Sequence, residues 1–263
     1  MPYANVNGAR LYYEQHGEGP DLVFAHGAGG NHMVWWQQLP VFAQEFRCTV
    51  YDARGWGLSK GDMAAGRWAF GTDLVALLDH LGIERAHFVA QSMAGRAIAG
   101  VIRLGPERIR SVVFSGTNGG VANGRIREIQ DELRELRGDG GLRDHALSDE
   151  FEVREPKLAL LYRQMNALNP KRPKGMLGRP PPSYKGSMHE LIAGTGAPVL
   201  FIVGEHDRIT SPELIREAVS LVPGSRYQEV ADAGHSAYFE RPEEWNRAVL
   251  QFLHAIPARN AAK

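Results

Sequence analysis

The sequence predicts an α/β fold, in which helices flank a mostly parallel central sheet. Short apolar runs with strand character alternate with segments that carry apolar residues at helical spacing. The runs are apolar at consecutive positions, which is typical of strands buried on both faces of a parallel sheet. Such alternation favours a single sheet layered between helices. The apolar runs are residues 21–25, 47–51, 86–90, 111–114 and 199–203.

The remaining elements follow from local signals around this sheet. Residues 6–13 predict an opening hairpin, because Asn7-Gly8 is a typical two-residue turn between strands. Residues 72–82 carry apolar positions at helical spacing and end on a glycine, which predicts a helix. The motif Ser-Pro-Glu at residues 211–213 begins another helix, with a capping side chain, a first-turn proline and an acid beside it.

The alternation stops between residues 118 and 186. Within this stretch, residues 125–137 are highly charged but place isoleucine and leucine on one helical face. Residues 169–186 are rich in proline, lysine and glycine. We interpret residues 118–186 as an inserted cap of helices and an irregular loop. Residues 1–117 and 187–263 then form the core.

Composition argues against several classes of partner. The 263 residues include 30 basic and 30 acidic ones, and this zero net charge argues against nucleic acid or an anionic membrane. No apolar run is long enough to cross a bilayer, and the first residues lack the pattern of a secretory signal. The single cysteine, Cys48, lies in a predicted strand and is expected to be a buried, inert thiol. We therefore expect a cytoplasmic protein.

The most informative motif is FVAQSMAG, residues 88–95, in which a predicted strand ends at Ser92 and a helical stretch begins. A serine hydroxyl is a weak nucleophile unless a base activates it. A sharp strand-to-helix turn exposes the hydroxyl and admits only small residues on either side of the serine. Ala90 and Ala94, two residues before and after Ser92, meet this requirement. Ser92 is therefore the candidate nucleophile. The preceding Gln91 has two interpretations, facing the substrate pocket or bonding to neighbouring backbone.

The chain also contains the partners that a nucleophilic serine needs. Asp207 follows a predicted strand end and His235 lies in a later loop, which gives the order serine, aspartate, histidine. Because catalytic groups gather at the carboxyl edge of a parallel sheet, we expect these side chains to meet there. The glycine-rich loop at residues 26–30 predicts half of an oxyanion hole, in which the backbone N–H of Ala28 joins that of Met93. The rival interpretation, a phosphate-binding loop, lacks the Gly-Lys-Ser/Thr that would follow.

Together these motifs resemble the α/β-hydrolase fold superfamily, over nearly the whole chain. Residues 52–59 match its Asp-x-Arg-Gly-x-Gly-x-Ser loop, and residues 35–40 and 234–242 match further motifs. The family usually carries glycine on both sides of the serine, where this chain has alanine, and each alanine adds one methyl group to a crowded turn. The resemblance implies a serine–histidine–aspartate triad, and structural roles for part of the loop at residues 52–59. The residues given those structural roles are Asp52, Arg54 and Gly55.

The resemblance implies hydrolysis of a carboxylic ester or lactone through an acyl-enzyme, with a small-molecule substrate and no cofactor. We expect no metal, because His26, His32, His206 and His235 lack a ligand spacing such as His-Glu-x-x-His. One alternative is a carbon–carbon bond hydrolase of aromatic ring-cleavage products. Another is a slow-turnover ligand receptor on the same scaffold. A monomer and a homodimer are equally acceptable.

Substrate choice depends on the pocket, which the cap and loops shape in this fold. The expected wall is apolar, although core packing explains each of its residues equally well. Its residues are Trp35, Trp36, Leu158, Leu161 and Met165. A carbon–carbon bond hydrolase also needs a cation that holds the substrate carboxylate, and Arg96, Arg125 and Arg163 are the candidates. For the basic cluster at residues 171–174, a solvated loop is favoured over an anion contact.

Overall fold

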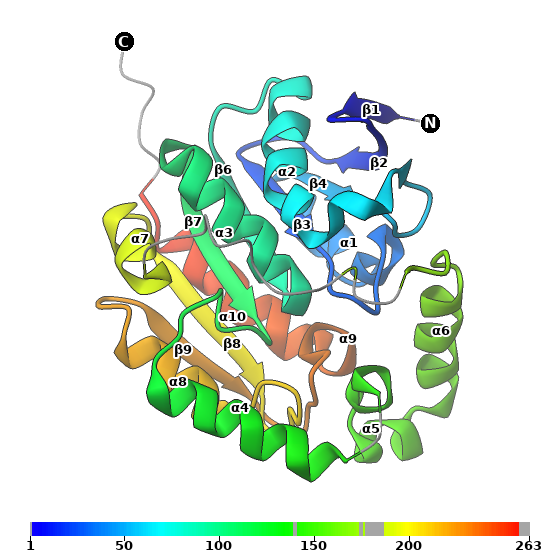
Figure 1. Ribbon diagram of the computed structural model, residues 1–263, viewed down its shortest axis with the longest axis vertical. Coiled ribbons are helices and arrows are strands. Elements are labelled where there is room, and N and C mark those ends of the chain that lie inside the picture. Colours follow the sequence, from blue (N-terminus) through cyan, green and yellow to red (C-terminus); the bar gives the residue numbers. More distant parts are fainter. Residues whose placement is uncertain (1, 139–140, 174–175, 177–186, 258–263) are drawn as a thin grey trace.

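The computed structural model describes residues 2–138, 141–173, 176 and 187–257, and within them a nine-stranded sheet forms the centre of the molecule (Figure 1). The strand order is β1-β2-β4-β3-β6-β7-β8-β9, with the short β5 paired to β2. The strands are β1 (Tyr3–Val6), β2 (Ala9–His16), β3 (Asp21–Ala25), β4 (Arg47–Tyr51), β5 (Lys60–Gly61), β6 (Ala86–Gln91), β7 (Ile109–Ser115), β8 (Val199–Gly204) and β9 (Arg226–Val230).

The sheet is mostly parallel, which confirms the predicted α/β fold. β1 and β2 form the expected antiparallel hairpin, and Asn7 and Gly8 both have positive φ, as its tight turn requires. β2 also pairs antiparallel with β4. From β4 to β9 every neighbouring pair is parallel. β6 lies between β3 and β7, so its carboxyl end opens at the middle of the sheet edge.

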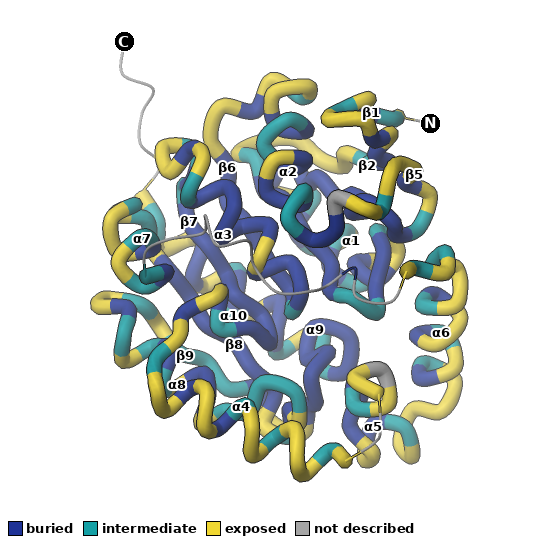
Figure 2. Tube along the Cα trace, in the orientation of Figure 1, coloured by how far each residue is buried: buried dark blue, intermediate teal, exposed yellow. Residues whose placement is uncertain are grey.

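Helices cover both faces of this sheet. α2, α3 and α8 pack Leu74, Ile98 and Leu214 into one apolar core, and α1 and α10 pack Phe42 and Trp245 into the other. Figure 2 shows the central strands and the inward sides of these helices as buried. The core helices are α1 (Leu39–Phe42), α2 (Ala69–His80), α3 (Gly95–Leu104), α7 (Met188–Gly194), α8 (Pro212–Ser220), α9 (Ala237–Glu240) and α10 (Pro242–His254).

Three α-helices lie in the described part of the segment between β7 and α7, which the sequence assigns to the cap. They are α4 (Gly124–Arg137), α5 (Asp149–Arg154) and α6 (Pro156–Ala167). α4 packs along α8, where Arg125 bonds to Glu213, and α5 and α6 lie at the edge of the core (Figure 1). Lys174 and residues 177–186 of the expected loop lie outside the described residues. The described Arg172 has its guanidinium 4.1 Å from the centre of the Trp56 ring.

Two further predictions concern membrane passage and the cysteine. Among the helices of the described residues, none is both long and apolar enough to pass through a membrane. Cys48 is fully buried in β4, and burial raises the pKa of its thiol to about 12. A thiol with so high a pKa carries almost no thiolate near neutral pH, which agrees with the expected inert role.

Candidate active site

Ser92 occupies a strained turn between β6 and α3. It is the first residue of a short 3₁₀ turn, η3 (Ser92–Ala94), and its φ of 51° lies in the left-handed region that few non-glycine residues adopt. The alanines on either side, Ala90 and Ala94, are both buried. The turn therefore forms with alanine at both positions. It holds the serine at the carboxyl end of a central strand, and such strain is a feature of functional sites.

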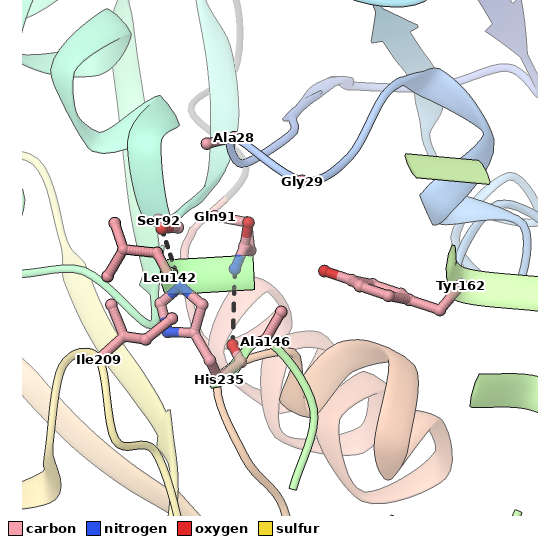
Figure 3. A pocket seen from close by; sticks show the side chains of 9 residues that line it. All are labelled: Ala28, Gly29, Gln91, Ser92, Leu142, Ala146, Tyr162, Ile209 and His235. Atoms are coloured by element: carbon pink, nitrogen blue, oxygen red, sulfur yellow. Dashed lines mark hydrogen bonds between the residues drawn. The ribbon is translucent and has the colours of Figure 1, made fainter. Parts of the chain in front are cut away.

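Ser92, His235 and Asp207 form a continuous chain of hydrogen bonds. His235 Nε2 lies 2.8 Å from Ser92 Oγ, and His235 Nδ1 lies 2.8 Å from Asp207 Oδ2. Figure 3 shows the Ser92–His235 contact at the edge of a pocket. Because a carboxylate only accepts, Nδ1 donates to Asp207, which leaves Nε2 of the neutral ring free to accept from the serine hydroxyl. The aspartate and histidine are 3% and 5% exposed.

Further hydrogen bonds fix the carboxylate of Asp207 in the loop after β8. Its Oδ1 accepts from the backbone N–H of Ile209 at 2.7 Å and of Thr210 at 2.9 Å. Its Oδ2 accepts from the Thr210 hydroxyl at 2.8 Å as well as from His235. Hydrogen bonds from these protein donors thus hold the Asp207 carboxylate in place. They set its orientation toward the histidine before any substrate binds.

The loop that carries His235 is tied down by a buried carboxylate, Glu240. Glu240 Oε2 accepts from the backbone N–H of Gly234 at 2.9 Å and from the hydroxyl of Ser148 at 2.8 Å. Burial raises the pKa of Glu240, while these hydrogen bonds oppose the shift. Ser148 belongs to the segment assigned to the cap, so Glu240 joins that segment to the histidine loop. The sequence motif at residues 234–242 includes Glu240 but does not reveal this partner.

The two residues predicted to supply the oxyanion hole, Ala28 and Met93, both lie near Ser92. Met93 is the second residue of η3, where a backbone N–H has no acceptor within its own helix. Ala28 lines the same pocket as Ser92. A turn in which Gly30 N–H donates to Gly27 O at 3.0 Å shapes the Ala28 loop. A Cβ on Gly27 would lie 1.7 Å from Gln91 Oε1, so a side chain there would displace the Gln91 amide.

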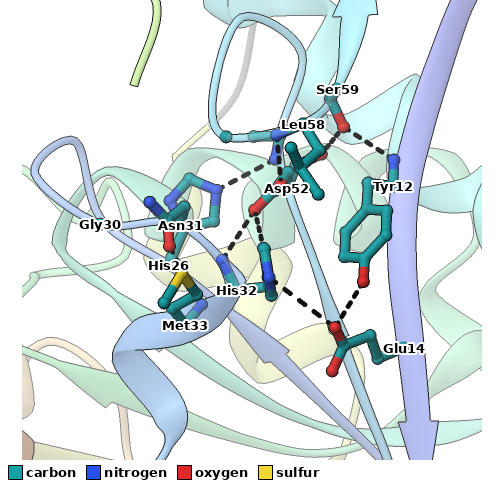
Figure 4. A network of polar contacts seen from close by, with 12 residues as sticks. Tyr12, Glu14, His26, Gly30, Asn31, His32, Met33, Asp52, Leu58 and Ser59 are labelled. Carbon is teal, nitrogen blue, oxygen red and sulfur yellow. Dashed lines mark hydrogen bonds and ion pairs between the residues drawn. The ribbon is translucent and has the colours of Figure 1, made fainter. Parts of the chain in front are cut away.

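A polar network beneath this loop centres on Asp52 (Figure 4). Its buried carboxylate accepts from the backbone N–H of His32 at 2.7 Å, from the ring of His32 at 2.9 Å and from Leu58 N–H at 2.7 Å. Ala53 N–H donates to His26 Nε2 at 3.0 Å, and burial lowers the pKa of His26, which keeps the ring neutral and able to accept. The network joins the loops at residues 26–32 and 52–59.

Arg54 makes a buried ion pair in the same region. Its guanidinium lies 2.8 Å from both carboxylate oxygens of Asp73, and Nη2 also donates to the Asn7 carbonyl at 2.7 Å. Gly55 follows with a φ of 82°, in the region that favours glycine. These contacts involve backbone and core side chains, in keeping with the structural roles expected for this motif.

The pocket beside Ser92 is small, with a cavity volume of about 60 Å³. Its lining is Ala28, Gly29, Gln91, Ser92, Leu142, Ala146, Tyr162, Ile209 and His235. Tyr162 enters from α6 and points its hydroxyl into the pocket from the side opposite Ser92 (Figure 3). That hydroxyl also bonds to Ser236 Oγ at 3.0 Å. Both interpretations of Gln91 apply, because it lines the pocket and its amide lies 3.5 Å from the His235 carbonyl.

The expectation that Trp35 and Leu161 line the pocket is wrong. Trp35 is fully buried in the core, where its ring centre lies 5.1 Å from that of Phe24 and 4.6 Å from that of Tyr238. Leu161 packs against the same core. On α6 one residue corresponds to a rotation of about 100°, so Tyr162 reaches the pocket and Leu161 does not.

The other wall residues and the candidate cations also lie elsewhere. Trp36 is exposed, and Leu158 and Met165 pack in the core. Arg125 is paired with Glu213 and Arg163 with Glu152. Arg96 is absent from the described lining, which contains neither lysine nor arginine.

Sequence spacing gave no sign of one group of potential metal ligands. Among the described residues, Glu205, His206 and Asp232 bring their ligand atoms within 4.8 Å of one another at the protein surface. Asp232 is also paired with Arg241 at 2.6 Å, which competes for the same carboxylate. The absence of a metal stays a prediction.

A mostly parallel sheet with a strained serine turn after a central strand defines the class of the α/β hydrolases. The family model for the alpha/beta hydrolase fold matches residues 20–242, and the chain belongs to this family.

Curated relatives and solved structures cover nearly the whole chain. A Mycobacterium tuberculosis protein provisionally named non-heme bromoperoxidase BpoC is 30% identical over 267 residues, which cover 94% of this chain and 99% of that protein. A 3-oxoadipate enol-lactonase of Acinetobacter baylyi is 26% identical, with 90% of each chain covered. The structure of a thermophilic esterase from Thermogutta terrifontis superposes with a TM-score of 0.81 at 23% identity, covering 97% of this chain and 99% of that one. This last likeness concerns the fold alone.

Proposed function

We propose that this protein is a serine hydrolase that cleaves a carboxylic ester or lactone through an acyl-enzyme. The observation that carries the proposal is the chain of two 2.8 Å contacts from Ser92 through His235 to Asp207, which ends at a pocket. A base that contacts the nucleophile and is oriented by a buried carboxylate is the arrangement that activates a serine hydroxyl.

The proposed mechanism assigns each step to a named group of this chain. His235 removes the hydroxyl proton as Ser92 Oγ attacks the substrate carbonyl, and Asp207 stabilises the resulting imidazolium. The backbone N–H groups of Ala28 and Met93 receive the charge on the tetrahedral oxygen, a contribution of about 3 kcal/mol per donor in related sites. His235 then protonates the leaving alcohol as the carbon–oxygen bond breaks. It next takes a proton from the water that attacks the acyl-enzyme, and returns this proton to Ser92 Oγ as the acyl carbon–oxygen bond breaks and the acid is released.

The relatives support this reaction class more than they specify the substrate. The 3-oxoadipate enol-lactonase is named for lactone hydrolysis. Another relative, from Paraburkholderia phymatum and 26% identical over 93% of this chain, is named as a 2-hydroxy-6-oxononadienedioate hydrolase. Such a dianionic substrate calls for a cation, and the described pocket lining contains no lysine or arginine. The ester or lactone reaction is therefore favoured over carbon–carbon cleavage.

Covalent labelling tests the nucleophile. We expect a fluorophosphonate to label the wild-type protein at one site, because its phosphorus takes the place of the substrate carbonyl carbon. Ser92→Ala should abolish labelling and ester hydrolysis together. The control is Ser220→Ala, which removes an exposed hydroxyl that donates to the Glu217 carbonyl in the last turn of α8. Mass spectrometry of the intact protein measures the adduct. Full labelling of Ser92→Ala would place the nucleophile elsewhere.

A substrate panel separates the reaction classes. It contains p-nitrophenyl esters, simple lactones and a ring-cleavage dienoate, each assayed with wild type and Ser92→Ala. We expect Ser92-dependent turnover of an ester or lactone. Turnover of the dienoate alone would assign carbon–carbon cleavage. Tight binding of a small molecule, with turnover well below about one per minute throughout, would favour the ligand receptor.

A further inference from the structure

The end of α6 and Asn169, two residues beyond it, contact the loop that carries Ala28. Asn31 Nδ2 donates to the carbonyl of Met165 at 2.9 Å, and Asn169 Nδ2 donates to the carbonyl of Gly30 at 3.1 Å. The amide of Asn166 lies against Gly29, since a Cβ there would be 3.1 Å from Asn166 Nδ2. The loop is thus held from the side of the inserted helices.

Asn169 also reaches a second loop. Its Oδ1 accepts from the backbone N–H of Gly57 at 2.9 Å, while its Nδ2 donates to Gly30. Gly57 has a φ of 46°, and a Cβ there would lie 2.1 Å from Asp52 Oδ2, so this backbone approaches the Asp52 carboxylate closely. One amide side chain therefore bridges the two loops that the Asp52 network joins from below.

The loop that carries Ala28 needs such a bridge because it is rich in glycine. Gly27, Gly29 and Gly30 surround Ala28, and glycine gives the backbone freedom but no side chain that packs it in place. An oxyanion donor has to lie within about 2.7 to 3.1 Å of the developing charge, so a small displacement of the loop weakens it. Contacts from outside the loop therefore add to its own turn, from Gly30 N–H to the Gly27 carbonyl, in fixing the position of Ala28.

We propose that Asn169 is a positioning residue for the oxyanion hole, which fixes the Ala28 loop by bridging the Gly30 carbonyl and the Gly57 N–H. The proposal rests on the proposed function, because it gives Asn169 a part in stabilising a tetrahedral oxyanion. Asn169 acts through the backbone and does not touch the reacting atoms. Its removal lowers stabilisation of the transition state more than binding of the substrate, so the effect falls on kcat.

Two substitutions remove the bridge in different ways. Asn169→Ala removes both hydrogen bonds. Asn169→Asp keeps an acceptor for Gly57 N–H but loses the donor, and sets a carboxylate against the carbonyl of Gly30. The matched control is Asn123→Ala. It also removes an asparagine from the inserted segment, where Asn123 caps α4 by accepting from Ile126 N–H and bonds to Glu217, away from the described pocket.

The experiment measures p-nitrophenyl acetate hydrolysis together with inhibition by a trifluoromethyl ketone, whose serine adduct is a tetrahedral oxyanion. For both Asn169 variants we expect kcat to fall by about tenfold to a hundredfold while KM changes by less than about twofold. The inhibition constant of the ketone should rise by the same factor as kcat/KM falls. Asn123→Ala should lower the melting temperature and leave kcat and ketone inhibition unchanged.

Several results would overturn the proposal. One is a wild-type kcat in both Asn169 variants, and another is a loss of activity with unchanged ketone affinity. A loss that disappears once the assay temperature is set well below each variant's melting point would indicate a purely structural role. If Asn169→Ala does not fold, Asn169→Asp decides by the same readouts. If a fluorophosphonate does not label the wild-type protein, the proposed function is contradicted instead. If it labels the wild type and the Asn169 variants keep wild-type activity, only the role of Asn169 is contradicted.

Discussion

At the scale of single residues, Gln91 connects three parts of the site. Its Oε1 lies against the backbone of Gly27, its Nε2 lies 3.5 Å from the His235 carbonyl, and its backbone precedes Ser92 at the end of β6. The side chain is buried and forms part of the pocket wall. Gln91 thus spaces the Ala28 loop from the histidine loop, and its position depends on Gly27 having no side chain.

This spacing predicts strong coupling between positions 27 and 91. Gly27→Ala places a methyl group within 1.7 Å of Gln91 Oε1, so the amide is displaced into the pocket or the loop moves. We expect kcat/KM to fall by about a hundredfold. In a Gln91→Ala background the same Gly27→Ala change should lower kcat/KM much less. A smaller loss of kcat/KM remains, because the new methyl group lies 3.1 Å from the Ser92 Cβ. Four values of kcat/KM complete the cycle, and additive losses would contradict this account.

At the scale of elements, β6 and β7 share a buried histidine that the proposed mechanism does not use. His87 on β6 lies 2.7 Å from the hydroxyl of Ser111 on β7 and is 3% exposed. Burial, followed by the charges of Arg110 and Arg85, lowers the pKa of His87 to about 4. The folded protein therefore keeps this ring neutral at pH values where an unfolded chain, with a histidine pKa of about 6.5, is protonated.

The sign of the resulting pH dependence is fixed. Above about pH 6.5 the His87 ring is neutral in both the folded and the unfolded state, so it does not change the free energy of unfolding. Between about pH 6.5 and 4 only the unfolded chain takes up the proton. The free energy of unfolding should therefore fall by up to about 3 kcal/mol across this window. His87→Gln should show a smaller decline between pH 7 and 4.5 in urea titrations, whereas the exposed control His80→Gln should match wild type. Equal slopes for His87→Gln and wild type would refute this contribution.

The same elements show what a sequence can and cannot predict here. The sequence predicts β3, β4 and β8 from their apolar runs, and Ser92 from its small neighbours, because these signals are local. It does not predict the pocket wall, since Leu161 and Tyr162 differ only by their rotation about α6. The bridges from Glu240 to Ser148 and from Asn169 to Gly30 span 92 and 139 residues. Nothing in the local pattern of either residue marks such a partner.

At the scale of the whole molecule, the pocket lies between the loops at the edge of the sheet and the segment between β7 and α7. Ser92, His235 and the Ala28 loop provide the core side, and Leu142, Ala146 and Tyr162 close it from the segment between β7 and α7. Tyr162 is fixed by its bond to Ser236 and by an edge contact with Phe239, whose ring centre is 5.0 Å away. These two contacts hold the wall opposite the serine in place.

Its small volume predicts the size of the acyl group. A cavity of about 60 Å³ is far below the roughly 300 to 1,000 Å³ of sites for drug-sized ligands, so we expect it to accept only a short acyl chain unless Tyr162 moves. Across p-nitrophenyl esters from acetate to octanoate, we expect kcat/KM to be highest for the two shortest chains and to fall at least about tenfold by octanoate. Tyr162→Ala should shift the optimum to longer chains, because it removes the wall opposite Ser92. Tyr162→Phe keeps the ring and should keep the wild-type profile. A wild-type preference for octanoate, or the same shift in both variants, would show that the wall at Tyr162 does not set the chain length.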